Sequence, residues 1–179
     1  ANNGVIGYQD YLPWHLPRDL RHFRQLTIWQ PNIMGRVTYD GIHARFGPSV
    51  LPYRINILVT RQKSHFIGIK YQVNSLEAAI ERAREYLENQ RRIAEGVDKS
   101  ANLPNGREPE IMLIGGAQIY AQGMPIATRM YLTRVDADPE GDTFFPPIGP
   151  EWVLKSGEHH PRDAANEFAM TFQVWEKNT

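Results

Sequence analysis

The stretch IMLIGGAQIY, residues 111–120, shows the unit from which the chain is built. Residues 111–114 form a continuous apolar run, and the pair Gly115 and Gly116 separates this run from a helical pattern that starts near Gln118. Continuous apolar runs are typical of strands buried in a parallel sheet, and glycines often mark the turn that follows. The stretch therefore predicts a strand, a tight turn and a helix in direct succession.

The same alternation extends outward in both directions. Further β-rich apolar runs cover residues 32–34, 55–60, 69–73, 130–135, 152–156 and 168–176. Helical patterns cover residues 17–26 and 75 to about 94, and the last two β-rich runs have no helical pattern between them. Alternating strands and helices indicate an α/β fold with helices on both faces of the sheet. We predict a single domain over residues 1–179, with a mostly parallel central sheet and an antiparallel hairpin at its C-terminal edge.

The longest helical pattern begins at Asn74 or Ser75, and either residue can cap a helix. Its apolar face comprises Leu76, Ala79, Ile80, Ala83 and Leu87. The stretch that follows it, residues 96–110, is polar and contains proline and glycine. This composition predicts an exposed loop.

Composition and charge narrow the function classes. The chain of 179 residues carries 20 Lys+Arg and 20 Asp+Glu, so its formal net charge is zero and gives no electrostatic reason to expect nucleic acid or an anionic membrane as partner. Cysteine is absent, which excludes disulfides, thiolate catalysis and Cys-ligated zinc and fits a reducing compartment. No apolar run is long enough to span a membrane. We expect a cytoplasmic monomer that acts on a small molecule.

One acidic residue lies among apolar positions. If residues 16–27 are helical, Asp19 falls on the arc formed by Leu16, Leu20, Phe23, Leu26 and Thr27. An acid on an apolar face loses hydration, which raises its pKa unless a partner compensates, and such a group suits proton chemistry or the binding of a cationic ligand. Alternatively, Asp19 follows Pro17 at the start of the helix and only favours the helix dipole. The pattern alone leaves both interpretations open.

Three segments at strand ends are candidates for binding phosphate groups. They are Gly35-Arg36-Val37-Thr38, Thr60-Arg61-Gln62 and Gly115-Gly116-Ala117-Gln118. A helix start reached through glycine presents free N–H groups, and arginine at a strand end can bind the extra phosphate of NADPH. Each segment alone can equally be a tight turn, and the G-x-G-x-x-G fingerprint is missing. Together they are more suggestive, because open α/β sheets bind ligands at the carboxyl ends of their strands.

Metal and nucleophile chemistry find little support. The six histidines have no metal-ligand spacing, and His159 and His160 fall in what we predict to be a polar turn. No serine has the context of a nucleophile elbow. We therefore assign no metal.

Read in order, short motifs along nearly the whole chain resemble those of bacterial dihydrofolate reductases. They are VIG at 5–7, LPWHLP at 12–17 with Asp19, IMGR at 33–36 with Thr38, LP at 51–52 with Arg54, IGG at 114–116, YLT at 131–133, and EGDT at 140–143 followed by FP at 145–146. The resemblance implies reduction of 7,8-dihydrofolate to 5,6,7,8-tetrahydrofolate by hydride from NADPH, in supply of one-carbon metabolism and nucleotide synthesis.

The resemblance also implies residue roles around the pterin. Asp19 would hold the N3 and 2-amino groups and support protonation of N5, Thr133 would hydrogen-bond Asp19, and Trp14 would order a water nearby. The expected walls around the pterin and benzoyl group are Leu20, Phe23, Ile42 and Leu51. Arg54 would bind the α-carboxylate of the glutamate tail, with Arg24 beside that tail.

For the cofactor, the resemblance implies a closing loop and two binding segments. The loop would run from Ile6 and Gly7 to Leu12 at its tip and would cover the nicotinamide, steadied by the segment that contains Asp142. The adenosine end would be lined by Arg36, Val37, Thr38, Thr60, Arg61, Gln62 and Asn74. The pyrophosphate and nicotinamide ribose would be held by Gly115, Gly116, Ala117, Gln118, Ile119 and Tyr120.

Three departures from the family pattern stand out. The sequence starts after the family's first apolar strand, and we expect the given sequence to be incomplete there. Residues 42–51 are longer than usual, and residues 96–110 are an insertion far from the implied chemistry. Two alternatives remain open: a related reductase acting on a riboflavin precursor, and a non-catalytic module that binds NADPH or folate.

Overall fold

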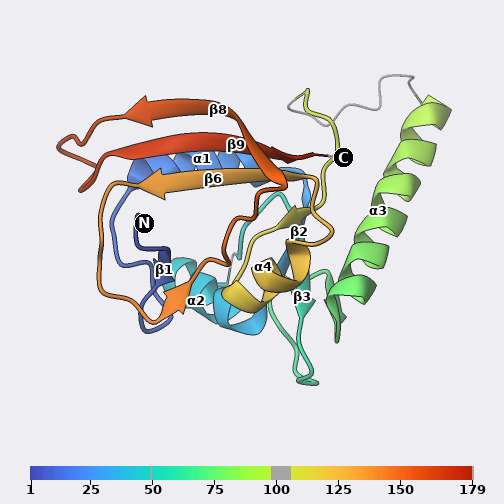
Figure 1. Cartoon of the computed structure of the whole chain (residues 1–179). Coiled ribbons are helices and arrows are strands. Elements are labelled where there is room, and N and C mark those ends of the chain that lie inside the picture. Colours follow the sequence, from blue (N-terminus) through green and yellow to red (C-terminus); the bar gives the residue numbers. More distant parts are fainter. Residues whose placement is uncertain (49, 98–105, 179) are drawn as a thin grey trace. The chain divides into compact units, whose positions relative to one another are not determined.

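The structure is a computed structural model that describes residues 1–48, 50–97 and 106–178 (Figure 1). Helices and strands alternate through much of this part of the chain. In order they are β1 (Val5–Gly7), α1 (Pro17–Thr27), β2 (Pro31–Gly35), α2 (Arg36–Phe46), β3 (Ile55–Val59), β4 (Tyr71–Val73), α3 (Leu76–Val97), β5 (Met112–Leu113), α4 (Ala117–Gly123), β6 (Arg129–Val135), β7 (Thr143–Phe144), β8 (Trp152–His160) and β9 (Met170–Lys177). No helix in these three ranges is long and apolar enough to cross a membrane.

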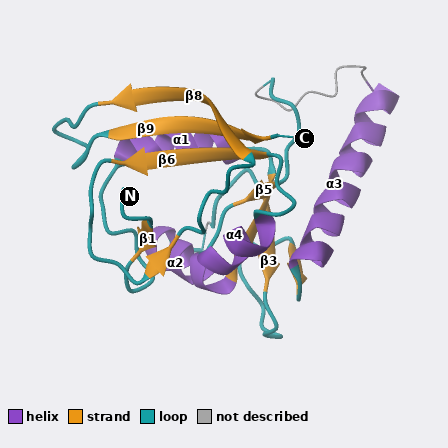
Figure 2. Ribbon diagram, in the orientation of Figure 1, coloured by secondary structure: helices purple, strands orange, loops and turns teal. Residues whose placement is uncertain are grey.

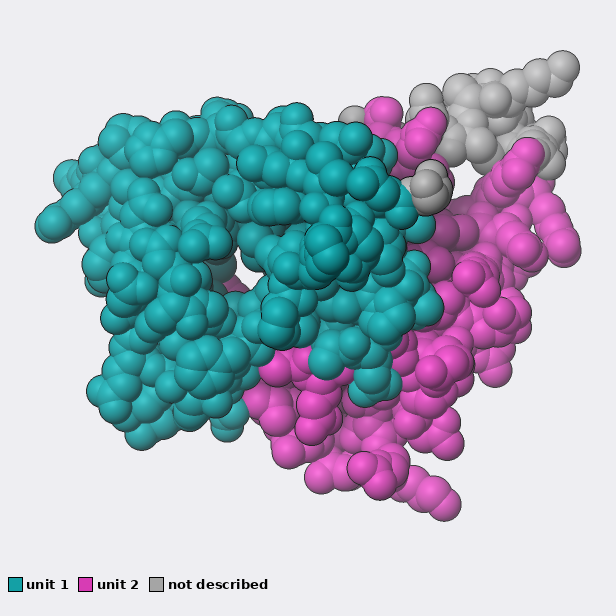
Figure 3. Space-filling view, viewed as in Figure 1, with its two compact units in different colours: residues 1–25, 120–179 teal, residues 26–119 magenta. Residues whose placement is uncertain are grey.

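The chain divides into two compact units, coloured separately in Figure 3. One unit comprises Ala1–Gln25 and Tyr120–Thr179, and the other comprises Leu26–Ile119. We call them the antiparallel unit and the parallel unit, after the direction of their larger sheets.

The parallel unit is built on a four-stranded sheet in the order β4-β3-β2-β5, with every strand pair parallel. Ile33 of β2 lies opposite Ile57 of β3, and both are fully buried. On their side of the sheet, α3 contributes Leu76, Ala79 and Ala83 to one apolar core. The next residues along the two strands, Met34 and Leu58, point to the other face and are also fully buried. Both faces of this sheet are therefore covered.

A side chain fixes the start of α3. The hydroxyl of Ser75 accepts the N–H of Ala78 at 3.2 Å, so Ser75 rather than Asn74 caps the helix. The helix runs to Val97 and takes in the first residues of the predicted loop 96–110. Residues 98–105 of that loop lie outside the described residues. Two hydrogen bonds fix the last part of the predicted loop. Arg107 donates to the carbonyl of Leu26 at 2.9 Å, and the amide of Glu110 donates to the side-chain oxygen of Gln30 at 2.8 Å.

The antiparallel unit contains a three-stranded sheet in the order β6-β9-β8 and a ribbon of β1 and β7 (Figure 2). β6 and β8 are the outer strands, and the pairing of β8 with β9 shifts register between Leu154 and Ser156. Helix α1 lies along this sheet, and the buried Leu16 at its start packs with Val135 of β6 and Met170 of β9 (Figure 1). This packing fixes which side of α1 faces the strands.

The fold class predicted from the sequence is confirmed: the structure is α/β, with a parallel sheet and antiparallel C-terminal strands. The predicted antiparallel hairpin is present as β8 and β9, and β6 pairs with β9 to extend it to a sheet of three strands. Two details differ. Helix α2 was not predicted and includes the first part of the segment 42–51. His159 and His160 lie in strand β8 instead of a polar turn.

Candidate functional site

Asp19 lies half-buried on the side of α1 that faces the antiparallel strands. Its carboxylate accepts a hydrogen bond from the side chain of Thr133 on β6. Burial raises the pKa of Asp19 above its usual value, while the Thr133 hydrogen bond and the charge of His22 act in the opposite direction. The dominance of burial leaves Asp19 as a carboxyl group that can hold a proton more readily than a surface acid.

Tyr120 is the second ionisable group at this position. Burial, with a smaller contribution from the negative charge of Asp19, raises the pKa of Tyr120 to about 12. Its ring packs at a tilt against Phe145, with the ring centroids 5.1 Å apart. Tyr120 is therefore protonated at neutral pH and offers an O–H donor in the neighbourhood of Asp19.

Directly after Pro13, the segment that leads into α1 is held by the antiparallel unit. Trp14 packs against the core of Leu16, Val135 and Met170. The amide of His15 donates to the carboxylate of Glu167 at 2.8 Å. Leu12, by contrast, is 44% exposed and so has a side chain available to contact a ligand.

The expected closing loop contains a tight turn. Tyr8 and Tyr11 exchange two backbone hydrogen bonds of 2.9 Å, and between them Gln9 and Asp10 both have positive φ angles of 48° and 66°. Two consecutive positive φ angles are the signature of a type I′ hairpin turn. Ile6 and Gly7 lie in β1, directly before this turn.

Asp142 ties that turn to the ribbon of β1 and β7. Its carboxylate accepts the N–H of Gln9 at 2.9 Å and the hydroxyl of Thr143 at 2.9 Å, and these hydrogen bonds lower the pKa of Asp142. Its own amide donates to the carbonyl of Gly7 at 3.1 Å. Asp142 is therefore the residue that fixes the position of the turn within this unit.

In the parallel unit, two of the three candidate phosphate segments come together. The amide of Gly35 donates to the carbonyl of Gly115 at 2.8 Å across the carboxyl ends of β2 and β5. A Cβ atom on Gly116 would lie 3.3 Å from the hydroxyl of Thr38, so the backbone and α2 approach closely. Ala117, Gln118 and Ile119 form the first turn of α4.

Both helix starts at this edge are open to an anion. Gly35 caps α2 without any side-chain hydrogen bond, and neither α2 nor α4 has an acid in its first turn. Unshielded N–H groups at a helix start favour negative charge, so this edge fits the pyrophosphate of a dinucleotide. Arg36 and Val37 are exposed there, and the guanidinium of Arg36 contacts the carboxylate of Asp40 one turn later.

The third segment ends the neighbouring strand of the same sheet. Val59, the last residue of β3, pairs with Gly35 on one side and with Val73 on the other, so residues 60–62 and Asn74 follow at this edge. The hydroxyl of Thr60 accepts the N–H of Gln62 at 3.2 Å, which shapes the turn around Arg61. Arg61, Gln62 and Asn74 are exposed. The strand ends therefore gather all the cofactor residues expected between 35 and 74.

Arg54 is half-buried beside the end of α1 that belongs to the parallel unit. Its Nε donates to the hydroxyl of Thr27 at 2.8 Å and its Nη1 to the carbonyl of Pro52 at 3.1 Å. Two hydrogen bonds from one guanidinium fix its plane, which is the condition for binding a carboxylate with two N–H groups. Thr27 was considered only as an apolar-face residue in the sequence, and its role as a partner of Arg54 was missed.

Leu51 is held by a residue that the sequence did not single out. The buried amide of Asn56 donates to the carbonyls of Val50 at 2.7 Å, Leu51 at 3.3 Å and Gly68 at 3.0 Å. An asparagine inside the apolar run INILV was the available signal, because a buried amide must find partners. The expected apolar contacts Ile42, Leu20 and Phe23 are half-buried, whereas Arg24 is exposed.

The structure thus has two clusters: a half-buried acid with hydroxyl donors in the antiparallel unit, and glycine-marked strand ends with arginines in the parallel unit. Within the described part of the chain, no group of three His, Asp or Glu side chains is placed to hold a metal ion.

Comparisons with known proteins identify the family. A family model described as dihydrofolate reductase matches residues 1–177. Dihydrofolate reductase of Haemophilus influenzae is 34% identical over 173 residues, which cover 96% of this chain and 91% of that protein. Dihydrofolate reductase type 3 of Salmonella typhimurium is 35% identical, with 96% and 90% covered.

A solved structure agrees. Dihydrofolate reductase from Enterococcus faecalis, complexed with NADP(H) and RAB-propyl, matches with a TM-score of 0.76 at 26% identity and covers 98% of this chain and 90% of that one. The fold and these matches define an α/β oxidoreductase. More particularly, the chain belongs to the dihydrofolate reductase family, whose enzymes use NADPH, and the resemblance and enzyme class expected from the sequence are confirmed.

Proposed function

We propose that this chain reduces 7,8-dihydrofolate to 5,6,7,8-tetrahydrofolate with NADPH and so supplies one-carbon metabolism and nucleotide synthesis. The observation that carries the proposal is the half-buried Asp19 with a raised pKa and a hydrogen bond from Thr133, in a member of the dihydrofolate reductase family. The reduced bond is a C=N bond of the pterin, which takes up a hydride at carbon and a proton at N5. NADPH, when bound, would supply the hydride.

Asp19 would serve the proton side of the reaction. Its carboxylate would accept hydrogen bonds from N3 and the 2-amino group of the pterin and would favour the N5-protonated substrate electrostatically. Thr133 would orient the carboxylate, and Trp14 would help to order a water beside it. Leu20 and Phe23 would line the pterin on the same helix, and Leu12 at the tip of the closing loop would help to exclude water.

The strand ends of the parallel unit would hold the cofactor. Gly115, Gly116 and the first turn of α4 would bind the pyrophosphate through backbone N–H groups. Arg61 and Arg36 would bind the 2′-phosphate, for which Arg36 would exchange its contact with Asp40. The exposed side chains of Val37, Gln62 and Asn74 would contact the adenosine end.

Arg54 would bind the α-carboxylate of the glutamate tail, since Thr27 and Pro52 already orient its guanidinium. Leu51 and Ile42 would flank the benzoyl group, with Arg24 along the tail. We further propose that residues 1–179 work as one catalytic domain, monomeric and cytoplasmic, with neither nucleic acid nor membrane as partner.

A spectroscopic assay tests the proposal. Purified protein should lower the NADPH absorbance band only when dihydrofolate is present, and tetrahydrofolate should form in equal amount. Turnover with a riboflavin precursor and none with dihydrofolate would replace the substrate assignment. Binding of NADPH and folate without any turnover would reduce the protein to a binding module.

A further inference from the structure

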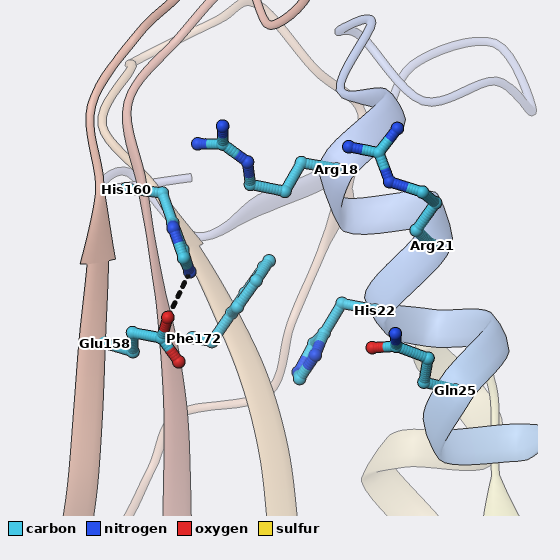
Figure 4. Close-up of a pocket in the computed structure, with 7 residues that line it drawn as sticks. All are labelled: Arg18, Arg21, His22, Gln25, Glu158, His160 and Phe172. Carbon is cyan, nitrogen blue, oxygen red and sulfur yellow. Dashed lines mark ion pairs between the residues drawn. The ribbon is translucent and has the colours of Figure 1, made fainter.

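A cavity of about 300 Å³ opens beside α1 on the antiparallel unit (Figure 4). Its lining comes from α1, β8 and β9 and comprises Arg18, Arg21, His22, Gln25, Glu158, His160 and Phe172. The imidazole of His22 points from α1 toward the strands in this view. The cavity gives that imidazole access to solvent, so its protonation can follow the pH of the medium.

Phe172 of β9 fixes the ring of His22. The two rings stack with centroids 3.9 Å apart and planes only 8° from parallel. The ring of His160 also contacts Phe172, with centroids 4.6 Å apart and an angle of 55°. Such close, parallel stacking holds the His22 imidazole in one orientation.

Phe172 lies beside Thr133, the residue that hydrogen-bonds Asp19. In the ladder of β6 and β9, Phe172 is the direct partner of Thr133, and directly paired side chains lie on the same face of a sheet. Thr133 hydrogen-bonds Asp19, and Asp19 precedes His22 by three residues on α1, a spacing at which helix side chains are neighbours. Asp19, Thr133, Phe172 and His22 are therefore neighbours between one helix and two strands, joined by the Thr133 hydrogen bond at one end and the ring stacking at the other.

We propose that His22 is a positioning residue for Asp19, and that its stacked imidazole couples its own protonation to that of the Asp19 carboxyl group. The proposal rests on the proposed function, in which Asp19 serves substrate protonation. Histidine titrates near neutral pH, so the coupling operates in the range where the enzyme would work. Protonated His22 stabilises the Asp19 carboxylate, which agrees with its contribution to the pKa of that group.

Other charges face the pair from each neighbouring element. On α1, Arg18 and Arg21 disfavour the imidazolium, although Arg18 is held by Asp163 at 2.8 Å. On β8, Glu158 favours it but already contacts the Nε2 of His160 at 3.2 Å. Tyr120 remains neutral up to about pH 12 and so contributes no charge that varies near neutrality. Asp19 is therefore the acid on α1 itself whose protonation is coupled to that of His22.

Histidine titration by NMR tests the coupling without any substrate. The His22 resonance, identified by its loss in His22→Phe, should titrate at lower pH in Asp19→Asn than in the parent, by about half a unit or more. Coupling between two sites is reciprocal, so a real effect of His22 on Asp19 requires this shift. His159→Gln is the matched control, because His159 is exposed on β8 and bonds Thr171, and should leave the His22 titration unchanged. An unchanged His22 titration in Asp19→Asn overturns the proposal.

The rate of hydride transfer provides the second measurement. His22→Phe keeps a ring against Phe172 but removes the charge, so the falling limb of the pH–rate profile should move upward by about half a unit or more. On that limb the variant should then be at least about threefold faster than the parent, whereas His159→Gln should match the parent. A profile that does not move overturns the proposal. Reciprocal NMR shifts in a protein that fails to reduce dihydrofolate would instead overturn the proposed function alone.

Discussion

Asp19 combines two opposed demands, since the burial that suits it to proton chemistry also disfavours its charged form. Replacement by asparagine keeps the shape and the hydrogen bond from Thr133 but removes the charge. We expect hydride transfer at neutral pH to fall by roughly 10²–10⁴-fold in Asp19→Asn, the usual worth of a group positioned for proton transfer. The rate should recover in part at lower pH, because solvent can then protonate the substrate. Stopped-flow rates across pH measure both effects, and a parental profile would remove Asp19 from the mechanism.

Arg61 offers a test of cofactor choice at the level of one side chain. An exposed guanidinium at the end of β3 can bind the 2′-phosphate that NADPH has and NADH lacks. A charged hydrogen bond contributes about 1.5–3 kcal/mol, so Arg61→Ala should weaken NADPH binding by roughly 10- to 150-fold and spare NADH. Arg82 on α3, which pairs with Glu85 at 2.7 Å, is the matched control. Equal losses for both cofactors in a fluorescence titration would show that Arg61 does not read the phosphate.

Replacement of Arg54 should affect the KM for the substrate and not the KM for the cofactor. Loss of one partner of a hydrogen-bonded charge pair costs about 2 kcal/mol or more, so Arg54→Ala should raise the KM for dihydrofolate by about thirtyfold or more. The KM for NADPH should change little. Arg24→Ala, which removes an exposed arginine from α1, should have the smaller effect on the KM for dihydrofolate. Steady-state kinetics with each substrate varied in turn decide the matter.

At the scale of elements, the short ribbon of β1 and β7 depends on the absence of a side chain at Gly141. A Cβ atom there would collide with Val5 and would lie 2.8 Å from the carbonyl of Gly7. We expect Gly141→Ala to destabilise the protein by about 1–3 kcal/mol, the range for forced overpacking. Gly157→Ala on β8 is the control, since its nearest neighbour is Thr171 at 3.6 Å, an ordinary contact. Urea unfolding of both variants makes the comparison.

The burial and the length of each element explain whether the sequence could predict it. Strands β2, β3 and β6 coincide with β-rich, mostly apolar runs and were found nearly to the residue, as was α1. Helix α2 was missed because only Tyr39 of its residues is buried, so no apolar stripe marks it. Strands β1 and β7 are three and two residues long, too short for any periodicity to show.

The site residues likewise differ in whether their signal is local in the sequence. Asp19 could be singled out because an acid among apolar helical positions is a local anomaly. Thr133, Arg54 and Asn74 came only from the family resemblance, since their neighbours are distant in sequence. His22 is not among the apolar positions of α1, so no sequence pattern singled it out. Its significance depends on Phe172, 150 residues further along the chain, and no local pattern reports such a contact.

At the scale of the whole molecule, stability should depend on pH through carboxyl groups that act in opposite directions. Asp142 and Asp163 have pKa values lowered by the hydrogen bonds that they accept, chiefly from Gln9 and from Asn166. Their contribution to folding is present above the unfolded pKa of about 3.9 and is lost as pH falls through their lower folded values. Asp19 has a raised pKa, so its ionisation costs stability as pH rises above about 3.9.

Melting temperatures across pH should therefore resolve the two kinds of acid. The parent should lose Tm below about pH 4, and Asp163→Asn should show a smaller loss there because its carboxylate is already absent. Asp19→Asn should melt at or above the parent near neutral pH and converge with it in acid. A lower Tm of Asp19→Asn at neutral pH would contradict the assigned direction.

Strand β8 has a consequence for how copies of this protein meet in concentrated solution. As an outer strand of its sheet, it forms an edge of nine residues, and such an edge can pair with a strand of another chain. The shift in register after Leu154 interrupts the regular row of donors and acceptors, and Lys155 and Glu158 place charges of both signs along it. These features oppose edge-to-edge association and aggregation without any change to the core.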